Sequence, residues 1–386
     1  MTTQNVNNSV EWLRFQPTNM KIAIDIRDAG RARAGKGWYT YNIITELLKL
    51  DTRNEYILYS NTKKNPFKGS KNAEIRCIEE KMPKWHFKVI QDLKKNPVDL
   101  FFAPTSFIIP AFAPRSLRVI ITVHDLVAFL FPGTHSVKAT LIERLTLKKA
   151  LKKAEKVFVV SENTKKDLLD KFDYPSSEII ETPCAPADFY REAVSDEELL
   201  KFKEQKKLPD NFILAVGTLE PRKNFATLIK GFVTFKKRHP DFKLVIVGKQ
   251  GWKFKQIEES LEKYNMKEEV IFPGYIEGES LHKMYKLARA FVFPSLYEGF
   301  GIPPLEAMAS GCPVVSSNVA SLPEVVGDAG LLIDPKNSYK MAEAVADLID
   351  HDNVRIMMIE RGLRQAEKFT WQKTAQIALE TFNSLA

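Results

Sequence analysis

Residues 293–308 read FPSLYEGFGIPPLEAM, and this stretch indicates the fold class. The apolar run that ends here, 290–294, is typical of a buried strand, and the pair Pro303 and Pro304 favours the start of a helix. The two glycines between strand and helix allow the backbone to approach a ligand closely. A strand, a glycine-rich turn and a helix in this order form the repeating unit of a parallel α/β sheet, whose ligands bind beyond the carboxyl ends of its strands.

Strands and helices alternate in the same way on both sides of this stretch. In the second half of the chain we predict strands at 212–217, 243–248, 270–272, 290–294, 313–316 and 330–333, with helices at 224–238, 280–287, 304–310 and 338–350. In the first half we predict strands at 21–27, 56–59, 74–78, 98–103, 118–123 and 156–160, with helices at 35–50, 137–154 and 162–172. Two such series predict two doubly wound parallel-sheet domains.

A break in the alternation separates the two series. Residues 182–188 hold two prolines, and 195–210 form a strongly charged helical stretch, so we place the connection between the domains here. The first residues are polar and lack the apolar centre of a signal peptide. The predicted organisation is a disordered lead-in at 1–19, a first domain at 20–190, a linker at 191–210, a second domain at 211–368 and a final segment at 369–386.

The composition is ordinary for a soluble globular protein, with 44% hydrophobic and 27% charged residues. No run reaches the roughly 20 apolar residues that a membrane-spanning helix needs. Cys77, Cys184 and Cys312 are widely spaced and odd in number, which favours neither a disulfide framework nor a zinc site. These features predict a cytoplasmic protein, where thiols stay reduced.

The net charge of +9 is concentrated in the first half of the chain. Residues 1–190 hold 30 basic and 21 acidic side chains, whereas 191–386 hold 27 of each. A basic half suits an anionic partner such as a membrane surface or a lipid phosphate, but a solvated basic surface explains it equally well. We find no nucleic-acid-binding motif and expect no nucleic-acid partner. The segments 81–95 and 138–156 are candidates for peripheral contact with the inner face of the cytoplasmic membrane, although each could be an ordinary surface helix.

The acidic pair in the opening stretch, Glu298 and Glu306, indicates a ligand with phosphates and hydroxyls. Loop N–H groups at a helix N-terminus bind phosphate. We expect Glu306 in the first turn of the following helix, where the helix dipole favours an anion. A carboxylate there can accept hydrogen bonds from two sugar hydroxyls at once. An isolated glutamate would more often be only a helix-start charge, but here two occur in one motif.

The pattern Glu-x7-Glu with a Gly-Phe-Gly-Ile-Pro interior resembles the signature of family 4 glycosyltransferases. The resemblance extends upstream over 216–224, VGTLEPRKN, and downstream over 311–316, GCPVVS, and 322–327, LPEVVG. It implies the GT-B architecture, in which two Rossmann-like domains face a cleft. It also implies retaining transfer of a sugar from a nucleotide-sugar donor to a saccharide acceptor. The sequence of these motifs most resembles that of bacterial GDP-mannose-dependent mannosyltransferases.

The resemblance assigns roles to individual residues. Glu306 would bind the ribose hydroxyls, and the basic pair Arg222 and Lys223 would neutralise the pyrophosphate, which gains negative charge as it leaves. Many relatives carry Arg where this chain has Thr218, so the pyrophosphate would depend more on Arg222. Tyr275 and Ile276 would line the nucleobase. Glu298 and the backbone of Gly299, Phe300, Gly301 and Ile302 would hold the donor sugar and its phosphates. Gly37 and Gly217 would be further donor-binding positions.

Two features of the first half bear on the same cleft. Residues 30–40, GRARAGKGWYT, nearly form a phosphate-binding P-loop, but Gly37 replaces the magnesium-binding hydroxyl residue. The family resemblance instead implies a turn facing the cleft, where Arg31, Arg33 and Lys36 would meet an anionic acceptor or the donor phosphate. His124 follows a predicted strand, and the resemblance implies that it lies near the donor sugar as a catalytic-site residue, although a lone histidine is more often structural.

We expect no metal requirement and no cofactor beyond the donor. Asp350 and Asp352 form the Asp-x-Asp pattern of this chain, a pattern that grips a divalent ion in other transferases. They end a predicted surface helix far from the other motifs, so we interpret them as solvated charge.

Several alternatives remain open for the reaction. Glu298 and Glu306 could be paired as in a retaining glycosidase, but such an enzyme has no use for Arg222 and Lys223, and front-face displacement fits better. The donor could be a UDP-sugar, as in glucosyltransferases. A nucleotide-sugar epimerase, a noncatalytic binding subunit or a P-loop protein are weaker alternatives. For a transferase, the expected acceptor is a saccharide or lipid-linked saccharide of a surface glycan such as O-antigen, and 369–386 would cross back to the first domain as a hinge.

Overall fold

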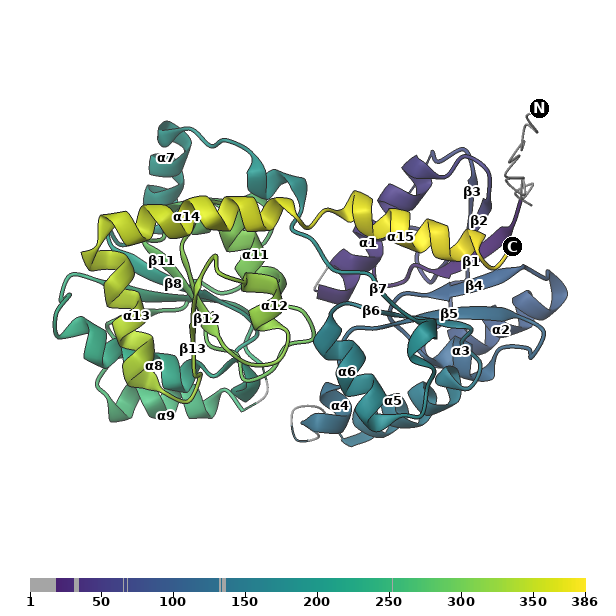
Figure 1. The fold of residues 1–386 in the computed structure, drawn as a ribbon, viewed down its shortest axis with the longest axis horizontal. Coiled ribbons are helices and arrows are strands. Elements are labelled where there is room, and N and C mark those ends of the chain that lie inside the picture. The colour runs from purple at the N-terminus through teal and green to yellow at the C-terminus, as the bar shows by residue number, and fades with distance from the viewer. Residues whose placement is uncertain are drawn as a thin grey trace, which may run out of the picture.

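The structure is a computed structural model that describes residues 19–30, 35–64, 66–67, 69–131, 133, 137–251 and 253–386. Two α/β domains lie side by side, each built around one parallel sheet (Figure 1). The predicted fold class of two doubly wound parallel-sheet domains is therefore confirmed.

The sheet of the first domain has the strand order β3-β2-β1-β4-β5-β6-β7. All neighbouring strands pair in parallel. The edge strand β7 was not predicted from the sequence. The strands are β1 (Lys21–Asp25), β2 (Glu55–Ser60), β3 (Ala73–Cys77), β4 (Leu100–Ala103), β5 (Arg118–Val123), β6 (Lys156–Val159) and β7 (Ile179–Glu181).

Helices cover both faces of this sheet, because successive strand residues point to opposite sides. Ile24 and Phe102 lie in one core cluster with residues of α1 (Gly35–Leu50) and α15 (Trp371–Asn383). Ile57 and Phe101 lie in another, with residues of the helices on the opposite face. These helices are α2 (Lys84–Lys95), α3 (Ile108–Phe112), α5 (Val137–Leu151) and α6 (Glu162–Lys171), and the short α4 (Val127–Leu130) precedes α5.

The second sheet has the order β10-β9-β8-β11-β12-β13 and is also parallel throughout. Its strands are β8 (Phe212–Val216), β9 (Lys243–Val247), β10 (Val270–Ile271), β11 (Ala290–Phe293), β12 (Val314–Ser317) and β13 (Leu331–Ile333). One face packs against α8 (Phe225–Lys236), α9 (Lys255–Lys263) and α13 (Ser338–Asp350). The other packs against α10 (Glu279–Leu287), α11 (Ile302–Ala309), α12 (Leu322–Val326) and α14 (Asp352–Glu367).

The chain crosses between the domains at two neighbouring places. The first crossing follows β7, because the short 3₁₀ helix Asp188–Arg191 already contacts α10 and α11 of the second domain. It therefore comes before the predicted linker 191–210, which is largely the helix α7 (Asp196–Lys206), capped by Ser195 and packed on α10. A capping box makes this charged segment a regular helix rather than a connector.

The second crossing joins α14 to α15, and α15 packs along α1 of the first domain (Figure 1). Arg191 donates hydrogen bonds to the carbonyls of Ala366 and Phe369, at 3.0 and 2.9 Å, so one side chain ties the two crossings together. Among the helices that the structure describes, none is long and apolar enough to cross a membrane.

Candidate functional site

The carboxyl ends of the two sheets face a common cleft of about 390 Å³. A volume of this size suits a small-molecule ligand. The cleft brings together residues from both halves of the chain that were predicted to form one site. These are His124, Gly217, Arg222, Lys223, Tyr275, Ile276, Glu298, Gly299, Phe300, Gly301, Ile302 and Glu306.

Part of the predicted first-domain turn, residues 30–40, lies at the cleft. Gly37 is buried in α1 and is not among the described residues that line the cleft, whereas Gly35 and Lys36, the two residues before it, are. Arg31 and Arg33 lie outside the described residues. Thr218 lines the cleft without adding a charge, so the positive charge on that wall comes from Arg222 and Lys223.

The start of α11 differs from the prediction and changes the setting of Glu306. The helix begins at Ile302, with the two prolines in its first turn, where no backbone N–H is needed. Glu306 is therefore the fifth helical residue, beyond the first turn in which we expected it. Gly301 precedes the helix with a φ of 116°, a left-handed conformation that favours glycine.

The carboxylate of Glu306 lies among buried aromatic hydroxyls. Tyr285 donates a hydrogen bond to it at 3.2 Å, and Tyr190 stands close by. Burial raises the pKa of Glu306 to about 7, although the hydrogen bonds from the two tyrosines oppose this shift. A carboxylate whose charge is poorly solvated gains from any ligand hydroxyl that donates to it.

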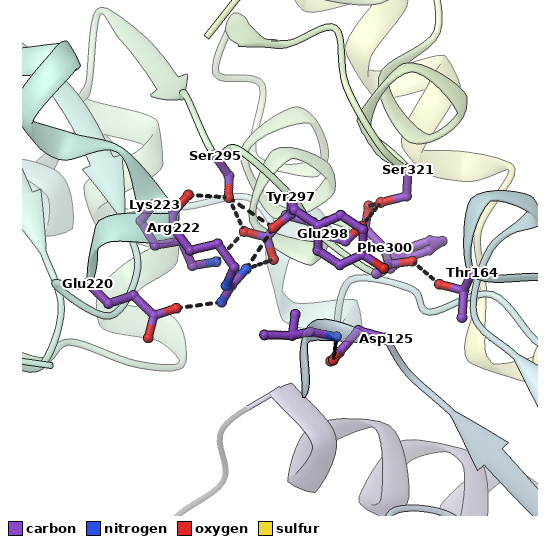
Figure 2. Close-up of polar contacts among 12 residues, drawn as sticks. Asp125, Thr164, Glu220, Arg222, Lys223, Ser295, Tyr297, Glu298, Phe300 and Ser321 are labelled. Atoms are coloured by element: carbon purple, nitrogen blue, oxygen red, sulfur yellow. Dashed lines mark hydrogen bonds and ion pairs between the residues drawn. The ribbon is translucent and has the colours of Figure 1, made fainter. Parts of the chain in front are cut away.

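Glu298 is the centre of a buried ionic cluster (Figure 2). Its two oxygens lie 2.6 Å from Lys223 Nζ and 3.0 Å from Arg222 Nη1, and the hydroxyl of Ser295 donates to it at 2.6 Å. Arg222 also pairs with Glu220 at 2.6 Å. Burial alone would raise the pKa of Glu298, but the charges of Lys223 and Arg222 outweigh burial and hold that pKa below its ordinary value.

This cluster holds two cations rigidly at the wall of the cleft. The side chains of Arg222, Lys223 and Glu298 are only 15%, 11% and 13% exposed. Their acidic partners fix the orientation of the guanidinium and ammonium groups but also cancel part of their charge. A buried pair of this kind is costly to break by removing one member.

The first-domain wall contributes His124, a neutral imidazole. Its Nε2 lies 2.7 Å from the carbonyl oxygen of Pro104, so this nitrogen carries the proton and Nδ1 is the acceptor. Burial and the positive charge of Lys36 lower the pKa of His124 to about 4. His124 therefore suits hydrogen bonding to a ligand hydroxyl rather than donation of a proton as an acid. Asp125 beside it lies 4.0 Å from Lys36 Nζ.

Tyr275 and Ile276 contribute apolar side-chain surface to the lining of the cleft. The ammonium of Lys249 lies 4.0 Å from the centre of the Tyr275 ring, and the Tyr275 hydroxyl donates to Glu277 at 2.6 Å. Asp350 of the Asp-x-Asp pattern pairs with Arg238 at 2.5 Å, away from the cleft. Among the residues that the structure covers, no cluster of three or more metal-ligating side chains is found.

Several cleft residues were missed by sequence reasoning. Asp125 directly follows His124 at the same strand end and could have been included. Tyr190 and Trp371 line the cleft, and Tyr285 donates to Glu306. The three come from separate segments, and nothing in their local sequence indicates that they meet at one site.

Comparison with known proteins agrees with this geometry. Residues 196–365 match the family model "Glycosyl transferases group 1" and residues 34–185 match "Glycosyltransferase Family 4". The chain is 32% identical over 275 residues to O-antigen chain mannosyltransferase B of Escherichia coli, covering 70% of this chain and 71% of that protein. It is 28% identical over 278 residues to the serotype-specific mannosyltransferase WbdA of the same organism, covering 69% of this chain but only 34% of WbdA, so the chain spans about a third of that relative.

Among solved structures, Anabaena Alr3699/HepE in complex with UDP and glucose superimposes with a TM-score of 0.76 at 19% identity, covering 95% of this chain and 100% of that one. The fold and the cleft thus define a glycosyltransferase with the GT-B architecture. The chain belongs to glycosyltransferase family 4, group 1. It is a hexosyltransferase, and its family uses nucleotide-sugar donors.

Proposed function

We propose that this enzyme transfers mannose from GDP-mannose to a saccharide or lipid-linked saccharide, with retention at the anomeric carbon and without a metal. The observation that carries the proposal is that one cleft brings the half-buried carboxylate of Glu306 together with the cations Arg222 and Lys223. The choice of mannose is supported by the names of the two curated relatives, both mannosyltransferases. A UDP-sugar is the alternative donor, since HepE was solved with UDP and glucose.

Six cleft residues bind the donor in the proposed reaction. Glu306 accepts hydrogen bonds from the ribose hydroxyls, and the side chains of Tyr275 and Ile276 contact the nucleobase. Arg222 and Lys223 stabilise the diphosphate as its negative charge grows, without reorganising. The neutral His124 contacts the donor sugar.

The proposed chemistry is displacement on one face of the sugar. The bond from the anomeric carbon to the phosphate oxygen breaks while the bond to the acceptor oxygen forms, and the departing phosphate takes the acceptor proton. Glu298 is a poor nucleophile for the double-displacement alternative, because Lys223, Arg222 and Ser295 already bind its oxygens. Trapping of a covalent sugar on Glu298 would contradict front-face displacement.

The donor is tested by calorimetric titration of the purified protein with GDP, UDP and ADP, with and without Mg²⁺. We expect GDP to bind at least tenfold more tightly than the other two, with no gain from the metal. Selective binding of UDP would keep the reaction class but replace mannose with a UDP-sugar. Failure of all three nucleotides to bind a folded protein would count against a transferase with this donor site.

The proposed lipid-linked acceptor implies contact with an anionic membrane, and the outer surface of α2, α3 and α5 suits it. These helices lie in one layer on the first sheet. Their exposed apolar side chains stand among lysines, a combination that favours the interface of an anionic bilayer. The apolar members are Phe87, Phe112, Leu141, Ile142 and Leu145, and the basic members include Lys84, Lys88, Lys94, Lys95, Lys148, Lys149 and Lys152.

Sedimentation with lipid vesicles tests this contact. The wild type is expected to bind vesicles rich in anionic phospholipid and to ignore zwitterionic ones. The variant Leu145→Ser/Lys148→Glu should lose most of this binding. The matched control is Leu200→Ser/Lys201→Glu on α7, where the leucine is equally exposed (58%, against 56% for Leu145) but lies in the second domain. Equal loss in both variants, or equal binding to both lipids, would contradict the assignment.

A further inference from the structure

The loop 297–301, which carries Glu298, is held through its main-chain carbonyl groups, to which side-chain hydroxyls bind. Within the second domain, the buried hydroxyl of Ser321 lies 2.9 Å from the carbonyl oxygen of Glu298 and 2.6 Å from that of Phe300 (Figure 2). Ser321 directly precedes α12, and its single hydroxyl proton is shared between these two carbonyl groups or donated to one of them.

The carbonyl between these two is held by the other domain. The hydroxyls of Ser161 and Thr164 lie 2.5 and 3.0 Å from the carbonyl oxygen of Gly299 (Figure 2 shows Thr164). Both side chains are buried, at 4% and 0% exposure, and both belong to the start of α6 in the first domain. Alternate carbonyls of the loop are thus bound by opposite domains.

The loop packs directly on the first-domain backbone at the same place. A Cβ atom added to Gly299 would lie 1.8 Å from the carbonyl oxygen of His124, so any larger residue would force the two domains apart. Two residues before Gly299, the hydroxyl of Tyr297 donates to Asp167 of α6 at 2.6 Å.

Glu324 forms a second bridge to α6. Its two oxygens accept hydrogen bonds from the backbone N–H groups of Glu162 and Asn163, at 3.0 and 3.2 Å. These are the first N–H groups of α6, which have no partner within the helix, and the helix dipole favours a carboxylate there. Glu324 belongs to the family-like run 322–327, to which no role in donor binding was assigned.

We propose that Ser161, Thr164, Asp167 and Glu324 are positioning residues, which give the 297–301 loop its donor-binding conformation only while the two domains are in contact. The inference rests on the proposed function, since it assumes that the loop binds the donor. The two hydroxyls act through Gly299 rather than on the donor, because neither is among the described residues that line the cleft. Apposition of the domains and donor binding are then coupled, so each favours the other.

The variant Ser161→Ala/Thr164→Val tests this coupling, since it removes both hydroxyls from the Gly299 carbonyl with little change in shape. We expect the affinity for the donor nucleotide to fall about tenfold or more, as lost hydrogen bonds to a buried carbonyl predict. Small-angle scattering of the ligand-free variant should give a larger radius of gyration than the wild type, and saturating nucleotide should reduce the difference. Thr164→Ser, which keeps the hydroxyl, should retain wild-type affinity.

Thr146→Val is the matched control, because its buried hydroxyl bonds within α5 of the first domain. It should change neither scattering nor affinity. Glu324→Gln, which keeps the shape but not the charge, should weaken nucleotide binding in the same direction. If Ser161→Ala/Thr164→Val matches the wild type in both measurements, the proposal is wrong. Should the wild type bind no nucleotide, the proposed function fails, and the ligand-free scattering comparison alone still decides whether these hydroxyls hold the domains together.

Discussion

Replacing Lys223 with Met is expected to lower kcat/KM about a hundred- to a thousandfold, as removal of one fixed group that stabilises developing charge does in other enzymes. The same change leaves Glu298 buried with one cation fewer, although Arg222 still lies 3.0 Å away. Breaking a buried ion pair by removing one partner costs about 3–5 kcal/mol of unfolding free energy. The single variant is therefore expected to lose both activity and stability.

A double-mutant cycle separates the two effects. In Lys223→Met/Glu298→Gln the excess negative charge of the cluster is gone, because Arg222 then faces Glu220 alone, and the new amide can still accept the hydrogen bond from Ser295. We expect the double variant to regain most of the unfolding free energy in denaturant titrations. Release of nucleoside diphosphate from the donor should stay near the level of the single variants. A double variant that is both stable and fully active would show that the leaving group does not depend on this cluster.

The pairing of the two cations with acidic side chains could not be predicted from the sequence. Arg222 and Lys223 were predicted to neutralise the pyrophosphate, and in the structure both are already paired with Glu298, and Arg222 also with Glu220. Because their acidic partners fix them, the two cations need no reorganisation when the donor binds. The same partners cancel part of their positive charge. The site is therefore preorganised rather than strongly positive.

Prediction from the sequence succeeded where the signal is local. The strand, turn and helix of 293–308 are defined by neighbouring residues, so the alternation of elements and the cleft at the strand ends could be predicted. The start of α11 was placed too late, because Pro303 and Pro304 are equally compatible with the first, second or third helical position. The error of two residues moved Glu306 out of the first turn.

The features that could not be predicted all depend on contacts between distant segments. The tyrosines around Glu306 and the hydroxyls of Ser161 and Thr164 carry no motif of their own. Their sequence neighbours form ordinary helices. The packing of α10 and of Asp188–Arg191 on α11 brings the tyrosines to Glu306, and the packing of the two domains brings Ser161 and Thr164 to the 297–301 loop. Long-range contact, rather than residue type, gives them their role.

Glu306→Gln is expected to make the free protein more stable at pH 8 while nearly abolishing nucleotide binding. Burial raises the pKa of Glu306 to about 7 in the folded state, above the ordinary value of 4.5. A raised pKa contributes stability that is complete below pH 4.5 and is lost as the pH rises through 7. At pH 8 the ionised carboxylate thus costs the wild type at most about 3 kcal/mol, which the neutral glutamine avoids.

The ionisation of Glu306 also controls the affinity for the donor nucleotide. Ribose hydroxyls donate more strongly to a carboxylate than to a carboxylic acid or an amide. The affinity of the wild type for the donor nucleotide should therefore fall as the pH drops from 8 to 6, whereas Glu306→Gln should bind about a hundredfold more weakly at pH 8 and show no such dependence. Calorimetry at pH 6, 7 and 8, with denaturant titrations at the same values, measures both effects. Glu258→Gln, at an exposed position on α9, is the control and should alter neither. A glutamine variant that is less stable than the wild type at pH 8 and binds the nucleotide normally would mean that Glu306 supports the fold rather than the donor.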